Sequence, residues 1–220
     1  MKSEDKKINY QLVLDETLNN IENSGRVPAL FLHACCAPCS SYVLEYLSQY
    51  FSITVFFYNP NIYPESEYEH RAAEIAGFIN RFPVKHEVRL ISENYDPSKF
   101  YETVKGLEEL GEGSERCYKC YELRLSESAR MAAELGFDYF TTTLSISPMK
   151  NAAWLNEIGR RLSEEYGVSY LYSDFKKRNG FKRSTEISAE YGMYRQDYCG
   201  CVFSYNERHN VTGSERLLTN

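Results

Sequence analysis

The chain has 220 residues, 43% of them hydrophobic and 25% charged, and its formal net charge at pH 7 is −6. It is long enough for one well-packed domain, and its composition is close to that of ordinary globular proteins. The longest apolar run, around residues 27–34, is far shorter than the roughly 18 to 20 residues of a membrane helix, and residues 1–10 lack an apolar leader segment. We therefore expect a cytoplasmic protein with no membrane partner, folded as a single domain over residues 1–220.

The first half of the chain alternates between helix and strand patterns. An amphipathic helix is expected over residues 8–23, inside an N-terminal helical extension of residues 1–27. Apolar and β-branched runs then predict strands at residues 29–34, 52–61 and 86–91. Helical spacing between and after these strands predicts helices at residues 40–50, 64–82 and 96–107.

The alternation continues in the second half of the chain. Helices are expected at residues 117–136 and 151–167, and strands at residues 138–146 and 169–174. Residues 172–220 form a basic, cysteine-containing C-terminal segment. Alternating elements of these lengths predict an α/β fold, in which a parallel sheet is flanked by helices on both faces. Ligands of such sheets collect outside the carboxyl ends of the strands.

Seven cysteines fall into three tight groups, and no cysteine lies outside a group. The first group follows the first predicted strand, the second begins a predicted helix, and the third lies near the C-terminus: Cys35, Cys36 and Cys39; Cys117 and Cys120; Cys199 and Cys201. Stable disulfides are rare in a reducing compartment, so clustered thiols point to metal or redox chemistry there. A lone buried cysteine is often only a small hydrophobe, but that reading does not explain the grouping.

The number of thiols limits the kind of metal centre. A four-thiolate zinc site or a four-iron cluster uses four cysteines and leaves three. Three protein ligands leave one coordination position open, which a catalytic metal needs. Two competing interpretations need no iron: a thiol–disulfide reductase working through Cys199 and Cys201, and a zinc-stapled RNA-binding module that is not an enzyme.

Five motifs, in this order and spacing, resemble those of a known family. They are HACCAPCS, RCYKCYELRL, TTTLSISPMKN, SDFKKRNGFKRS and YRQDYCGCVFS. Together they are similar to the epoxyqueuosine reductases of the QueH family over residues 28–206. The resemblance implies reduction of epoxyqueuosine to queuosine at the wobble position of tRNA, without cobalamin. It also implies a 4Fe-4S cluster beside an additional mononuclear iron.

The resemblance further implies a fold similar to the PP-loop enzymes, the adenine nucleotide alpha hydrolase-like or HUP fold. A PP-loop enzyme follows its first strand with small residues whose backbone N–H groups approach a pyrophosphate. Here residues 33–40 place metal-binding cysteines where the phosphate loop would be. We therefore expect no use of ATP.

Epoxide removal requires two electrons and two protons and releases water. We expect an unidentified low-potential electron donor, and an open-site iron suits the reaction as a Lewis acid. The predicted cluster ligands are Cys35, Cys36, Cys117 and Cys120. The remaining Cys39, Cys199 and Cys201 are expected at the second iron and act catalytically. Three residues near the cysteines are candidate proton donors: Tyr118, Tyr198 and His33.

A basic stretch is the expected contact with tRNA, even though the net charge of the chain is negative. It gathers five cations within eight positions: Lys176, Lys177, Arg178, Lys182 and Arg183. The alternative is a solvated loop. Arg195 and Gln196, beside the last cysteine pair, are expected to contact the modified base, and Arg195 is placed among the catalytic residues. Their alternative roles are a salt bridge and a surface amide.

Overall fold

The computed structural model describes residues 8–209, which are built around a five-stranded sheet in the order β3-β2-β1-β4-β5. Every neighbouring pair is parallel, so the predicted α/β fold with a parallel sheet is confirmed. The strands are β1 Ala29–His33, β2 Ser52–Phe57, β3 Val88–Ser92, β4 Tyr139–Thr142 and β5 Ser169–Tyr170. The chain leaves β1 toward β2 on one side and reaches β4 on the other, so the topological switch point lies between β1 and β4.

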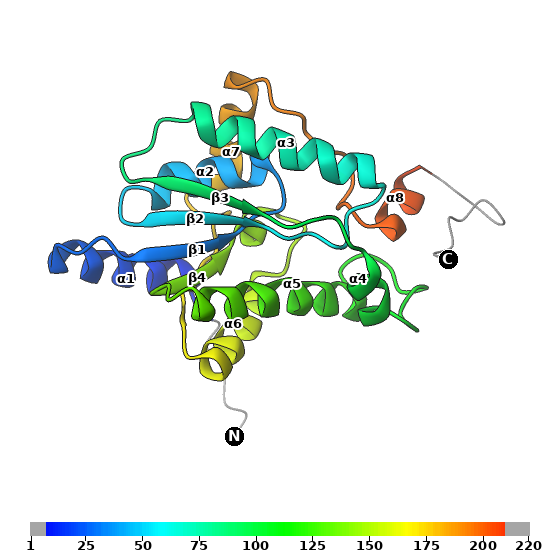
Figure 1. Cartoon of the computed structure of the whole chain (residues 1–220), viewed down its shortest axis with the longest axis horizontal. Coiled ribbons are helices and arrows are strands. Elements are labelled where there is room, and N and C mark those ends of the chain that lie inside the picture. The colour runs from blue at the N-terminus through cyan, green and yellow to red at the C-terminus, as the bar shows by residue number, and fades with distance from the viewer. Residues whose placement is uncertain (1–7, 210–220) are drawn as a thin grey trace.

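Helices cover both faces of the sheet (Figure 1). One face carries a core to which α1, α2, α3 and α7 contribute, and the opposite face packs against α5 and α6. The short helices α4 and α8 lie beyond the carboxyl ends of the strands (Figure 1). The bounds are α1 Tyr10–Ser24, α2 Ala37–Leu47, α3 Glu65–Arg81, α4 Ser98–Thr103, α5 Glu115–Glu134, α6 Ala152–Tyr166, α7 Gly180–Glu190 and α8 Val202–Arg208.

Three strands end earlier than their sequences predict, and the first of them, β2, ends at Phe57 and not at residue 61. β4 ends at Thr142, because the Thr142 hydroxyl accepts a hydrogen bond from the Leu144 amide at 3.2 Å and begins the 3₁₀ helix η1 (Thr143–Ile146). β5 is an edge strand that pairs with β4 alone, and it ends at Tyr170, opposite Phe140 of β4. The predicted strands at residues 138–146 and 169–174 were therefore wrong at their carboxyl ends.

Helices α7 and α8 were not predicted. The buried face of α7 consists of Gly180, Ser184, Ile187 and Ser188, so small and polar residues hide its amphipathic period. Helix α8 has only 7 residues, which is too short for a periodic signal. The C-terminal segment is therefore helical over much of its described part.

The turn after β1 is fixed by hydrogen bonds to the neighbouring strand. The Ala34 amide donates to the Phe56 carbonyl at 2.9 Å, and the Asn59 side-chain amide donates to the Ala34 carbonyl at 2.9 Å. Helix α2 begins at Ala37, three residues before its predicted start, with Pro38 in its first turn. As a result, Cys39 lies on the first turn of α2, directly beside the turn that carries the first two cysteines.

None of the helices within residues 8–209 is long and apolar enough to cross a membrane. The predicted N-terminal helix corresponds to α1, which is capped by the Asn9 side chain and ends at Gly25 with φ of +66°. Residues 1–7 of the predicted N-terminal extension and residues 210–220 of the C-terminal segment lie outside the described residues, so a single domain over the whole chain stays a prediction.

The close contact between α2 and α7 makes Gly180 sensitive to substitution. A Cβ at Gly180 would collide with the Phe175 carbonyl oxygen and lie 2.5 Å from Cε1 of Tyr42. We expect Gly180→Ala to lower the free energy of unfolding by about 1–3 kcal/mol, measured by urea denaturation. The matched control is Gly77→Ala in α3, where nothing lies within 4 Å of the new Cβ. It should raise stability by about 0.5–1 kcal/mol, and equal effects of the two substitutions would contradict this packing.

Candidate functional site

Cys35, Cys36 and Cys39 converge at the switch point between β1 and β4. Their Sγ atoms all lie within 4.8 Å of one another, and those of Cys35 and Cys36 are 3.8 Å apart. The Thr143 hydroxyl, at the end of β4, lies 3.9 Å from the Cys35 sulfur. We call these three cysteines the triad. Within residues 8–209, it is the one group of three His, Cys, Asp or Glu ligand atoms that lie this close together.

The triad favours a single negative charge when no metal is bound. Hydrogen bonds from Cys36 and Cys39 hold the pKa of Cys35 well below its usual value, and the Arg124 guanidinium adds to this effect. The same hydrogen bonds raise the pKa of Cys36 to about 12 and the pKa of Cys39 well above its usual value. These shifts favour the thiolate form of Cys35 and the thiol forms of Cys36 and Cys39.

The other four cysteines form a second group, which we call the quartet. Cys117 and Cys120 lie in the first turns of α5, and Cys199 and Cys201 lie in the loop before α8. Burial raises the pKa of three of these thiols: that of Cys117, that of Cys120 to about 11, and that of Cys201 to about 12. Negative charge on Cys199 raises all three pKa values further. Charge effects of this kind act over several ångströms, and no three of these four sulfur atoms lie within 4.8 Å of one another as those of the triad do. Cys120 and Cys201 belong to the same buried cluster.

Arg124 of α5 is a buried cation, 2% exposed, that has no carboxylate partner among the described residues. Its guanidinium donates to Asn59 Oδ1 at 2.5 Å, to His33 Nε2 at 3.3 Å and to Cys120 Sγ at 4.0 Å. Burial opposes the charge, but negative charges on Cys120 and Cys35 outweigh it and raise the pKa of Arg124. Because a buried cation requires a nearby anion, Arg124 favours ionised thiols in both the triad and the quartet.

Lys150 is the corresponding cation of the quartet. Its Nζ atom donates to Cys199 Sγ at 2.8 Å and forms an ion pair with Glu112 at 3.0 Å, and the side chain is almost fully buried. Burial again opposes the charge, but the neighbouring Cys199 and Tyr121 raise the pKa of Lys150. Lys150 is therefore an ammonium group held against a cysteine sulfur.

Arg71 is a third buried cation, on α3. It forms an ion pair with Glu67 at 2.7 Å, and negative charge on Cys36 helps to raise its pKa against burial. Its Nη2 atom has no hydrogen-bond partner. Gly200 approaches the same guanidinium: a Cβ at this residue, whose φ is +125°, would lie 3.1 Å from Nη1. A glycine between the last two cysteines is thus required by both its conformation and this contact.

A cavity of about 360 Å³ opens between the triad and the quartet, and we call it the catalytic cleft. This volume is within the range of small-molecule sites. Both cysteine groups and two of the buried cations contribute to its wall, through Cys35, Cys39, Cys199, Arg124 and Lys150. The rest of the wall is formed by Glu112, Leu144, Ser147, Met149, Phe181, Arg195, Gln196, Asp197 and Tyr198.

The structure brings all seven cysteines to one end of the sheet, but it groups them differently from the expected division. Cys39 lies with Cys35 and Cys36, whereas the sequence interpretation placed it with Cys199 and Cys201. The early start of α2 is the reason, because it turns Cys39 toward the two preceding cysteines. The geometry favours a division into three and four thiols, and the ligation itself stays a prediction.

Arg195 and Gln196 both line the catalytic cleft, as expected for residues that contact a bound base. The Gln196 amide donates to Cys36 Sγ at 3.2 Å. Arg195 donates to the Ser188 hydroxyl at 3.1 Å, and its guanidinium lies 5.8 Å from the ring centroid of Phe181. The catalytic role of Arg195 stays a prediction.

Of the three candidate proton donors, Tyr198 is the one that lines the catalytic cleft. His33 is fully buried, and burial together with Arg124 lowers its pKa to about 3, so its imidazole is neutral. Tyr118 packs edge-on against Trp154, with 5.5 Å between the ring centroids. The positions of His33 and Tyr118 are therefore structural ones.

Much of the positive charge of the basic stretch is neutralised by neighbouring carboxylates. Four of its side chains form ion pairs: Lys176 with Asp174, Arg178 with Asp15, Lys182 with Glu186, and Arg183 with Glu45 and Glu190. The pair of Lys182 is long, at 3.9 Å, and its side chain is 76% exposed. Lys177 has no ion pair with a described carboxylate, so Lys177 and Lys182 are the least neutralised cations of the stretch.

The sequence interpretation missed Arg124 and Lys150. Arg124 follows Cys120 by four residues in a helix, so its side chain shares a face with that cysteine, and this spacing was a usable signal. Lys150 lies 49 residues before its partner Cys199, and no local pattern connects the two.

The substitution Arg124→Met tests the buried cation. Without it, the pKa of Cys35 and that of Cys120 should both rise, so alkylation of the metal-free thiols should need a higher pH. Metal affinity should fall about 10–100-fold, as for other groups that hold metal ligands in place. The matched control is Arg130→Met on the same helix, which breaks only surface pairs with Glu127 and Glu134. An unchanged alkylation profile in the Arg124 variant would contradict the assignment.

Comparison with known proteins gives a consistent result. A family model described as "Epoxyqueuosine reductase QueH" matches residues 30–207. Proteins of that name include one from Streptococcus pyogenes serotype M1, 45% identical over 90% of this chain and 78% of the relative. Another, from Staphylococcus epidermidis, is 46% identical over 92% of this chain and 87% of the relative. A third, from Thermotoga maritima, is 38% identical over 81% of this chain and 91% of the relative.

A solved structure described as a predicted subunit of tRNA methyltransferase from Methanocaldococcus jannaschii is 11% identical, with a TM-score of 0.47, and covers 74% of this chain and 89% of that chain. The family relationship rests on the sequence matches, which extend over most of the described residues. The resemblance drawn from the five motifs is thereby confirmed. This chain belongs to the epoxyqueuosine reductase QueH family.

Proposed function

We propose that this chain reduces epoxyqueuosine to queuosine at the wobble position of tRNA, the last step of queuosine biosynthesis. Family membership supports the activity. The observation that carries it is the catalytic cleft, whose wall joins thiols of both cysteine groups to two buried cations. The reaction consumes two electrons and two protons, breaks both C–O bonds of the epoxide, forms a C=C bond and releases water.

The donor set fits the iron centres that the family implies. Four thiolates are the complement of a 4Fe-4S cluster, so we assign the quartet to the cluster and the triad to the additional iron. Cys35, Cys36 and Cys39 would hold this iron, and three protein ligands would leave it a further coordination position. When bound, these centres would supply electrons and an electrophilic site for oxygen. The buried guanidinium of Arg124, which lacks a carboxylate, supplies the charge that thiolate ligands need.

Lys150 is the residue best placed to handle the departing oxygen. Its ammonium group lines the cleft and is held at 2.8 Å from Cys199, with Glu112 on its other side. A fixed cation in a site that excludes water stabilises negative charge as it develops on oxygen, and an ammonium can then donate a proton. Tyr198, also in the wall, is the second candidate for a proton donor.

The remaining features of the proposal concern partners. Arg195 and Gln196 lie where a base inserted into the cleft would meet them. The triad fills the place of a phosphate loop after β1, which supports the expectation that ATP is not used. An unidentified low-potential donor would supply the electrons. Independence from cobalamin and a cytoplasmic location stay predictions.

Iron analysis and turnover, measured together, test this function. Wild-type protein purified anaerobically should contain iron above the roughly four atoms of one cluster, together with acid-labile sulfide, and should convert epoxyqueuosine in tRNA. Cys201→Ser should lose the cluster absorbance, because it removes a soft ligand. Cys39→Ser should keep the cluster absorbance but lose the additional iron and the conversion.

Different results would reject different parts of the proposal. Stoichiometric zinc without sulfide would favour the zinc-stapled RNA-binding module. Full activity of an iron-free wild type, with a redox-dependent bridge between Cys199 and Cys201, would favour the thiol–disulfide reductase. Loss of the cluster in Cys39→Ser, with Cys201 dispensable, would reverse the assignment of the two thiol groups.

Binding of tRNA through the basic stretch is tested with Lys177 and Lys182, because replacing Lys176 or Arg183 would also leave carboxylates unpaired. The double variant Lys177→Gln, Lys182→Gln should weaken tRNA binding and lower the salt slope of log K by about two, with unchanged metal content. The matched control replaces Arg81 and Lys85, two exposed cations between the end of α3 and the start of β3 that form no ion pair with a described carboxylate. Equal affinity and slope in both double variants would assign the stretch to solvent.

A further inference from the structure

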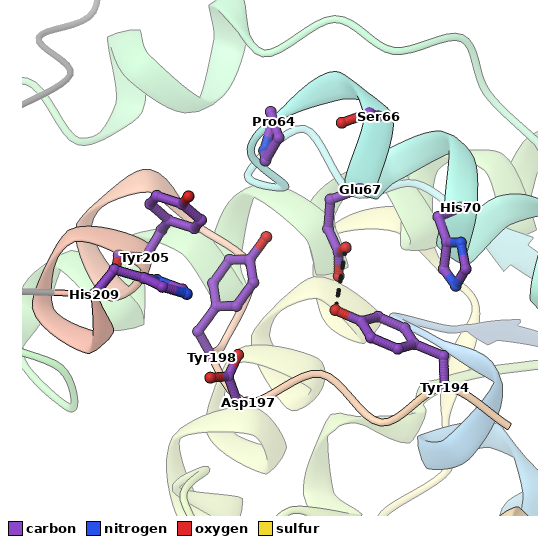
Figure 2. A pocket seen from close by; sticks show the side chains of 9 residues that line it. All are labelled: Pro64, Ser66, Glu67, His70, Tyr194, Asp197, Tyr198, Tyr205 and His209. Carbon is purple, nitrogen blue, oxygen red and sulfur yellow. Dashed lines mark hydrogen bonds between the residues drawn. The ribbon is translucent and has the colours of Figure 1, made fainter.

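The structure contains a second cavity, of about 450 Å³, whose lining residues are drawn in Figure 2. Asp197 and Tyr198 line both cavities, so they form a shared wall only two residues long. The rest of the second cavity is formed by α3, by the loop between α7 and α8, and by the end of α8. The cavity has no part in the chemistry described above. We call it the aromatic pocket.

Aromatic rings make up most of its wall: Tyr194, Tyr198, Tyr205, His70 and His209. Figure 2 shows Tyr198 and Tyr205 on one side of the pocket and Tyr194 and His70 on the other. Ring contacts hold each side together: Tyr205 stacks on His209 with centroids 4.2 Å apart, and His70 meets the edge of Tyr194 at 4.7 Å. The pocket therefore presents flat rings on two opposing sides.

The two tyrosines of the loop are held in position before any ligand binds. The Tyr198 hydroxyl donates to the Tyr63 carbonyl at 2.5 Å, and the Arg71 guanidinium lies 5.5 Å from its ring centroid. The Tyr194 hydroxyl donates to Glu67 at 3.4 Å, a contact drawn in Figure 2. Rings that are already ordered lose little freedom on binding, which favours recognition by stacking.

The charges in the pocket select the chemical class of the ligand. Its lining contains the carboxylates of Glu67 and Asp197 and no lysine or arginine. Each carboxylate is paired with a cation outside the lining, Glu67 with Arg71 at 2.7 Å and Asp197 with Arg208 at 3.1 Å. The lining therefore offers no cation to a phosphate, whereas its carboxylate oxygens can accept hydrogen bonds from the N–H groups of a base edge.

We propose that the aromatic pocket binds a nucleobase of the tRNA loop that neighbours the modified nucleotide, stacked on Tyr194. This inference rests on the proposed function. Unpaired loop bases are recognised by stacking on aromatic side chains, and successive bases of one strand occupy adjacent platforms. The two-residue wall places the pocket where the next base of a strand would lie when the modified base enters the cleft. One loop thus serves both bases, with Gln196 at the cleft and Tyr194 at the pocket.

The experiment uses anticodon stem-loops that carry epoxyqueuosine, either intact or with an abasic site directly 5′ or 3′ of it. Binding to the metal-loaded enzyme is measured by fluorescence anisotropy. Tyr194→Leu should weaken binding of the intact loop about tenfold, and Tyr194→Phe, which keeps the ring, should recover most of that loss. The control is Tyr166→Ala in the last turn of α6, outside both cavities, which should bind the intact loop as the wild type does.

The abasic loop that lacks the base bound in the aromatic pocket, whether the 5′ or the 3′ one, should bind wild-type enzyme about tenfold more weakly than the intact loop does. With that abasic loop, Tyr194→Leu should cause no further loss of affinity. His70→Ala, at an exposed position of α3, is a second probe and should show the same dependence on the neighbouring base. Either of two results would overturn the inference. In the first, Tyr194→Leu weakens the binding of all loops equally; in the second, both abasic loops bind wild-type enzyme with full affinity. Failure of wild type to convert the intact loop, with the affinity pattern retained, would overturn the proposed function instead.

Discussion

The buried guanidinium of Arg124 is the constraint on which the site depends. Its neighbour Asn59 uses its amide nitrogen to hold the Ala34 carbonyl and its oxygen to accept from Arg124. The turn after β1, the end of β2 and helix α5 are therefore joined through one side chain. A cation at this depth requires an anion, and Cys35, whose pKa Arg124 helps to lower, is the thiol that favours the ionised form. The fold and the ionisation of the thiols thus support each other.

The loop between α7 and α8 performs the second organising role. It carries two cysteines of the quartet, the amide that contacts Cys36 and two tyrosines of the aromatic pocket. Gly200 lets this loop turn with φ of +125° against Arg71, and the Gly200 carbonyl accepts from the Tyr63 amide at 2.8 Å. Contacts with α3 and with the segment before it therefore fix the positions of residues that serve both cavities.

The distribution of charge is consistent with recognition of a nucleic acid by shape and stacking. The chain is acidic overall, and most cations of the basic stretch already have carboxylate partners. Three further cations are buried near the cysteines and are not at the surface. The proposed tRNA contact would therefore use few phosphate contacts together with stacked bases, which suits a single-stranded loop better than a duplex.

The sequence by itself determined the alternation of helices and strands, the parallel sheet and the meeting of the cysteines at the carboxyl ends of the strands, because these follow from local periodicity and from the direction of parallel strands. It also carried five motifs specific enough to identify the family. Helix α7 escaped because small polar residues form its buried face.

Only the tertiary structure decided how the thiols are grouped and which cations face them. The grouping of Cys39 with the first two cysteines depends on where α2 begins, at Ala37 with Pro38 in its first turn. Lys150 meets Cys199, and Arg124 meets His33, across 49 and 91 residues of sequence. Contacts at such separations are set by packing of whole elements, and a pattern read over one helical turn or one strand contains no information about them.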